Sequence, residues 1–150
     1  MGRAGLVRSA AIAAALVATP FAASPAAQPG TSATAPAAAG TAQRRAILAA
    51  LRPPVEARFG PNVEFVVRSI EVRQGWAVVM ADPQRRGGAR IDPRRYYAAG
   101  DLEFMDGITI TAALRHRGGR WHPVRHAIGA TDIWYCDGTL PAPVSRSFGC

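Results

Sequence analysis

Apolar and polar residues alternate along residues 108–115 of this 150-residue chain, where every second position from Ile108 to Leu114 is apolar. An alternation with a period of two is typical of a strand with one buried face. Gly118 and Gly119 follow, and glycine readily adopts the positive φ angles that a two-residue hairpin turn requires. Trp121 then begins a returning strand. Residues 108–132 are therefore predicted to form a β-hairpin that serves as scaffold.

A second hairpin is predicted upstream. Residues 63–72 and 76–81 are rich in β-branched and large apolar side chains, and a short junction containing Gly75 separates them. Such a junction between two strand-like segments is a hairpin signal. Trp76, Val78 and Met80 are expected to share one face of the second strand.

A helix is predicted for residues 42–59, because apolar residues recur there at spacings of three and four. These residues are Ile47, Leu48, Leu51, Val55 and Phe59. Thr41 is a candidate N-cap, and Gly60 with Pro61 should end the helix. Pro53 and Pro54 each lack an N–H and crowd the preceding turn, so we expect either a kink there or two short helices.

The order of these elements predicts an α+β fold, in which an N-terminal helix, kinked at Pro53 and Pro54, packs on a four-stranded antiparallel sheet made of two hairpins. A cystatin-like or nuclear-transport-factor-like layout has this arrangement. That likeness concerns layout only.

The N-terminal third of the chain predicts export. Residues 1–27 combine Arg3 and Arg8 with a short Ala-, Leu- and Val-rich core, which is the layout of a removable signal peptide. No cysteine follows this core, so a lipid anchor is not predicted. Residues 28–41 are an Ala/Pro-rich stretch without charge that is predicted to be a disordered linker. Residues 42–150 remain for a single α+β domain, located in the periplasm or secreted, with no transmembrane segment after signal removal.

The charge of the chain favours an acidic partner. All eighteen basic residues are arginine, and the formal net charge is +8, which falls to +6 when Arg3 and Arg8 leave with the signal. A basic exported domain suits anionic lipid head groups, an acidic polymer or an acidic protein face. Nucleic acid is not expected, since no recognition motif accompanies the charge.

Cys136 and Cys150 are predicted to form a disulfide, because two cysteines that flank a turn-rich segment usually pair in an oxidising compartment. The bridge would close the C-terminal tail, which otherwise has little to hold it. A catalytic thiol pair is the alternative, although the Cys-x-x-Cys spacing is absent.

The connection between the hairpins, residues 83–105, is long and shows no clear periodicity, and such loops are often functional. It is the best candidate for a binding surface, since guanidinium groups interleaved with phenols bind phosphate, carboxylate or sugar faces. Its candidate binding residues are Arg85, Arg86, Arg94, Arg95, Tyr96 and Tyr97. The alternative is a solvated loop in which tyrosines cover the edge of the core and arginines pair with nearby acids.

His116, His122 and His126 lie around the last hairpin. Four residues of extended strand span about 13 Å, so His122 and His126 are not predicted to bind one metal ion. No metal and no cofactor are expected. His126 could act as a general base oriented by Asp101 or Asp132, but no recognisable nucleophile completes such a set.

Several segments together resemble an uncharacterised family of small exported proteins of Gram-negative bacteria that has no assigned activity. They are residues 45–53, residues 63–67, Trp76 with residues 83–85, and residues 119–121 followed by residues 127–132. The resemblance covers roughly residues 43–135. It implies a compact secreted α+β domain and supplies no catalytic residue; the tail between the two cysteines departs from it.

Two hypotheses follow. The first is an exported, non-catalytic accessory or binding domain of the cell envelope, which contacts an anionic or protein partner through the Arg/Tyr-rich loop. The second is a small hydrolase or isomerase with a site based on His126 in a cavity under the sheet. A third, an extracellular protease inhibitor, depends only on the layout of the elements.

Overall fold

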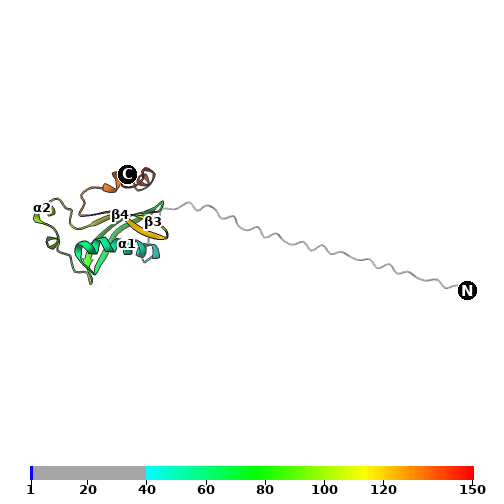
Figure 1. Cartoon of the computed structure of the whole chain (residues 1–150), viewed down its shortest axis with the longest axis horizontal. Helices are drawn as coiled ribbons and strands as arrows, with labels where there is room; N and C mark the ends of the chain where they lie inside the picture. The colour runs from blue at the N-terminus through cyan, green and yellow to red at the C-terminus, as the bar shows by residue number, and fades with distance from the viewer. Residues whose placement is uncertain (2–39) are drawn as a thin grey trace.

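The computed structural model describes Met1 and residues 40–150. In this part of the chain, helix α1 (Ala42–Phe59) precedes four strands, β1 (Val63–Arg73), β2 (Trp76–Arg85), β3 (Ile110–Arg117) and β4 (Arg120–Ile128). All neighbouring strands are antiparallel and the sheet order is β1-β2-β3-β4, so β2 and β3 join the two predicted hairpins into one sheet. The predicted α+β fold, a helix on a four-stranded antiparallel sheet, is confirmed (Figure 1).

The predicted signal peptide, residues 1–27, and the predicted linker, residues 28–41, lie outside the described residues except for Met1, Gly40 and Thr41. Thr41 is the N-cap of α1, as predicted, and its hydroxyl accepts a hydrogen bond of 3.2 Å from the Arg44 N–H.

Helix α1 runs through Pro53 and Pro54 as one element, so the alternative of two short helices is wrong. Tertiary packing explains why the helix continues, because the residues along its inner face are fully buried against the sheet. They are Ile47, Leu51, Val55 and Phe59, each 0% exposed. Gly60 ends the helix with a φ of 81°, and its N–H donates to the Glu56 carbonyl at 2.8 Å.

The face of the sheet toward α1 carries the main core. Alternate residues of the central strands β2 and β3 are buried there, as the period of two predicted for residues 108–115 required. They are Ala77, Val79, Ala81, Ile110, Ala112 and Leu114. The hairpin turn between β3 and β4 has positive φ angles at Gly118 and Gly119, which confirms the predicted turn.

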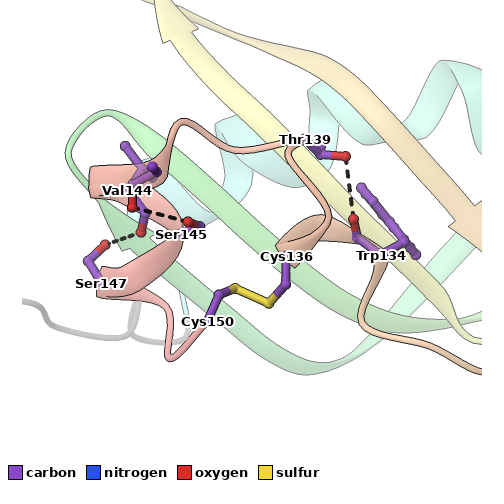
Figure 2. Close-up of a disulfide and its surroundings, with 8 residues drawn as sticks. Trp134, Cys136, Thr139, Val144, Ser145, Ser147 and Cys150 are labelled. Carbon is purple, nitrogen blue, oxygen red and sulfur yellow. Dashed lines mark hydrogen bonds between the residues drawn. A yellow bond between two sulfur atoms is a disulfide. The ribbon is translucent and has the colours of Figure 1, made fainter.

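The opposite face of the sheet is covered by the C-terminal segment, which contains the 3-10 helix η2 (Trp134–Cys136) and helix α3 (Ala142–Ser147) (Figure 1). Trp134, Leu140 and Val144 pack against Trp76 and other residues of this face and form a second apolar cluster. The predicted disulfide is present, because Cys136 bonds to Cys150 across a sequence separation of 14 (Figure 2). The expectation that little else holds the tail was wrong, since these apolar residues bury themselves on the sheet.

The connection between β2 and β3 begins later than predicted, because β2 extends to Arg85. It contains a turn closed by the Arg85 N–H bonding to the Ala89 carbonyl at 2.8 Å. The 3-10 helix η1 (Pro93–Arg95) and the short helix α2 (Ala99–Leu102) follow. The predicted binding residues are thus divided between a strand, a turn and a 3-10 helix.

Candidate anion-binding site

The side chains of Arg85 and Tyr96 form hydrogen bonds to the C-terminal end of helix α1. The Arg85 guanidinium donates to the Phe59 carbonyl oxygen at 2.5 Å and to the Pro61 carbonyl oxygen at 3.2 Å. It also donates to the Tyr96 hydroxyl at 2.5 Å, and that hydroxyl donates to the Phe59 carbonyl at 3.1 Å. Carbonyls of the last helical turn have no partner within the helix, so these two side chains satisfy one of them. These hydrogen bonds occupy donor groups of Arg85 and Tyr96 that an external ligand would need, so these two predicted binding residues are structural.

Arg86, Arg94 and Arg95 are different, because all three are exposed. No side-chain hydrogen bond or salt bridge within residues 40–150 involves their guanidinium groups. Asp92, the acid nearest in sequence to Arg94 and Arg95, accepts a hydrogen bond from the Arg94 backbone N–H at 3.1 Å as the cap of η1. Asp82, the acid nearest to Arg86, accepts hydrogen bonds from Arg68 and Thr109. In the described part of the chain, the alternative that loop arginines pair with nearby acids therefore does not apply to these three.

Tyr97 turns toward helix α1 and stacks under an arginine. The Arg58 guanidinium carbon lies 4.9 Å from the centroid of the Tyr97 ring, a cation–π geometry. The ring also packs edge-on to Phe59, with 6.3 Å between the centroids. Burial raises the pKa of the Tyr97 hydroxyl, and the nearby Arg58 charge only partly opposes this. The phenol consequently stays protonated at neutral pH and can donate a hydrogen bond.

Tyr97 lines a cleft of about 530 Å³ that lies between the C-terminal half of α1 and the end of β4. Three polar side chains from separate elements converge on it, namely Arg58, Tyr97 and His126. The other lining residues are Pro54, Ala57, Ala127 and Ile128. No carboxylate lines this cleft, so its fixed charge is positive.

A β-bulge puts His126 in the cleft. Leu114 pairs with Pro123 whereas Ala113 pairs with Arg125, so Val124 is an extra residue in β4. Paired residues share a face of the sheet, and a bulge reverses the alternation beyond it. His126 pairs with Ala112 on the α1 side, whereas His122 pairs with Arg115 on the other side. The two histidines therefore lie on opposite faces.

The acid–base pair considered for catalysis is not formed. Asp101 lies in α2 and Asp132 follows β4; both are exposed, and no hydrogen bond or salt bridge within residues 40–150 joins either of them to His126. No group of three or more His, Cys, Asp or Glu side chains in the described part of the chain is placed to hold a metal ion.

A second polar cluster joins β1, β2 and the residue before β3. The Asp82 carboxylate accepts hydrogen bonds of 2.7 Å from both the Arg68 guanidinium and the Thr109 hydroxyl. Burial by itself raises the pKa of Asp82, but these hydrogen bonds and the Arg68 charge together outweigh burial and lower it. The carboxylate is thus held charged by partners within the protein.

Sequence reasoning identified Tyr97 and His126 as members of two separate hypotheses and missed Arg58. Arg58 is an exposed residue of α1 and was not among the predicted binding residues. Its contact with Tyr97 joins residues 39 positions apart in sequence, and no local pattern signals such a contact.

The chain matches no protein-family model, no curated protein and no solved structure. Among the described helices, none has the length and apolar character needed to cross a membrane.

Proposed function

We propose that this protein is an exported, non-catalytic binding domain of the cell envelope, located in the periplasm or secreted, which holds an anionic or protein partner through its loop arginines. The observation that carries the proposal is the exposure of Arg86, Arg94 and Arg95, whose guanidinium groups have no hydrogen-bond or salt-bridge partner within residues 40–150. The signal-like residues 1–27 and the disulfide between Cys136 and Cys150 support export.

These guanidinium groups suit this role because none of their hydrogen-bonding capacity is used by the part of the chain that the structure describes. Each can form two parallel bonds to a carboxylate or a phosphate. An interaction between exposed charges is screened by salt, so binding should weaken as the ionic strength rises. The acidic residues near these arginines do not pair with them in the described part of the chain. Asp92 accepts a hydrogen bond as the cap of η1, and Asp101 is exposed.

The proposal is tested by capturing partners from envelope extract with three forms of the mature protein. The first is the wild type and the second carries Arg86→Ala, Arg94→Ala and Arg95→Ala. The matched control removes the same charge elsewhere, at three exposed arginines whose side chains make no hydrogen bond or salt bridge in the described part of the chain: Arg117→Ala, Arg120→Ala and Arg146→Ala.

A partner that is retained by the wild type and by the control, but lost from the loop variant, would support the loop as the binding surface. Equal capture by all three proteins, or capture by none, would refute it. Arg85 is left unchanged because its loss would disturb the end of α1 as well as the surface. The catalytic alternative shares the cleft that His126 lines, but within residues 40–150 neither Asp101 nor Asp132 forms a hydrogen bond or salt bridge with the imidazole.

A further inference from the structure

We propose that the cleft between α1 and β4 is a separate binding site for a small ligand that carries a carboxylate or phosphate group on an apolar body. The site does not include Arg86, Arg94 or Arg95, so the inference stands independently of the loop proposal.

The polar groups of the cleft favour an anion. Within residues 40–150 the Arg58 guanidinium has no salt bridge and no side-chain hydrogen bond, and its carbon lies 4.9 Å from the centroid of the Tyr97 ring. Tyr97 adds a protonated phenol, and His126 adds an imidazole from the opposite wall. All three can donate hydrogen bonds, and no carboxylate among the lining residues competes with a ligand for these donors, which favours an oxyanion.

The acid closest in sequence does not neutralise Arg58. Glu56 is bound elsewhere, because its carboxylate lies 3.4 Å from the Arg52 guanidinium and accepts a hydrogen bond of 3.3 Å from the Val63 N–H. The carbonyl end of α1 is also covered, since Arg85 and Tyr96 occupy the Phe59 oxygen. The negative end of the helix dipole therefore has its own compensation, and the positive charge of Arg58 remains for a ligand.

The other residues that line the cleft have apolar side chains. Pro54, Ala57 and Ile128 line the cleft, and a volume of about 530 Å³ falls within the usual range of small-molecule sites, about 300–1,000 Å³. Pro54 itself is an unfavourable residue in a helix interior, yet it forms part of this wall. Residues that break a local rule often mark functional sites.

The two walls come from distant parts of the chain and need the β-bulge at Val124, without which His126 would point to the other face of the sheet. Bulges are over-represented beside binding sites because they redirect a side chain. Pro54 lines this cleft, and the bulge precedes His126, another lining residue, by two positions.

The test uses two amphiphilic probes, octanoate and octyl phosphate, with octanol and inorganic phosphate as controls for each half of the ligand. Binding to the mature protein is followed by two-dimensional NMR of backbone amides, and dissociation constants are taken from the titration. We expect shifts at residues 55–58, 97 and 126–128 with at least one amphiphilic anion. The probe that binds more tightly distinguishes a carboxylate ligand from a phosphate ligand.

Arg58→Gln should weaken binding of that probe by about tenfold or more, because a charge-assisted hydrogen bond is lost. His126→Gln provides a second variant in case Arg58→Gln fails to fold, and Arg117→Gln, at an exposed arginine of the β3–β4 hairpin, should change nothing. The proposal is overturned if octanol binds as tightly as the anions, if both variants bind like the wild type, or if the shifts appear at residues 86–95 instead.

Discussion

The C-terminal segment offers the sharpest test of how the fold is held together. Replacing both Cys136 and Cys150 with serine removes the disulfide but leaves the apolar contacts of Trp134, Leu140 and Val144 with the sheet. Figure 2 shows that the bridge links η2 to the end of the chain just after α3. The double variant should keep its fold and lose stability.

The size of the loss follows from the length of the closed loop. With a sequence separation of 14 between the cysteines, the loop has about 15 residues, and the chain-entropy model gives about 3 kcal/mol of stabilisation for such a loop. This effect arises in the unfolded state, which the bridge restricts. Small domains usually have a free energy of unfolding of about 5–15 kcal/mol, so a loss of about 3 kcal/mol is a large part of it.

Urea unfolding followed by tryptophan fluorescence is the appropriate measurement, because Trp76 and Trp134 lie in the second apolar cluster and report on it. Wild-type protein unfolded under reducing conditions is the control, and it should show the same loss as the double variant. A change of less than about 0.5 kcal/mol, the scale of ordinary surface substitutions, would refute the reasoning. It would mean that residual contacts already restrict the segment in the unfolded state, so that the bridge removes little further conformational entropy.

Three further predictions concern single side chains. Gly129→Ala should lower the free energy of unfolding by roughly 2–4 kcal/mol, since φ is +68° there and a Cβ would lie 2.6 Å from a backbone carbonyl oxygen; thermal unfolding measures it. Tyr96→Phe should cost about 1 kcal/mol in urea unfolding through the lost hydrogen bond to Phe59, and an unchanged midpoint would show that Arg85 alone satisfies that carbonyl. The lowered pKa of Asp82 means that its stabilising contribution is complete above its unfolded-state pKa of about 4 and is lost as the pH falls through the lower folded-state pKa. Asp82→Asn should therefore flatten the fall of stability in acid, and an identical pH profile for the two proteins would contradict this.

Local pattern was sufficient for the long helix α1 and the four strands, but not for the short helices η1, α2, η2 and α3. The alternation from Ile108 to Leu114 and the glycine pair at 118 and 119 predicted the second hairpin, because both features act within a few residues of chain. The same holds for the Thr41 cap and the Gly60 terminus of α1. The disulfide also followed from composition, because the chain has only two cysteines.

Tertiary structure decided which of the candidate residues are available to a ligand. Arg85 and Arg86 are neighbours of the same type, yet Arg85 bonds to the end of α1 and Arg86 points to solvent, because β2 carries Arg85 past Phe59. The role of the C-terminal segment in covering one face of the sheet is likewise visible only in the tertiary structure, where Trp134 and Trp76 belong to one apolar cluster.

The cleft shows most clearly the difference between what local sequence pattern predicts and what tertiary structure decides. By itself the sequence determined that residues 42–59, 76–81 and 108–128 would form a helix and strands, since periodicity is a local property. It did not determine that Arg58, Tyr97 and His126 would line one cleft, because these residues lie 29 to 68 positions apart in sequence and one inserted residue, Val124, turns the imidazole toward the helix. Contacts of that kind arise from packing between whole elements, and no short stretch of sequence encodes them.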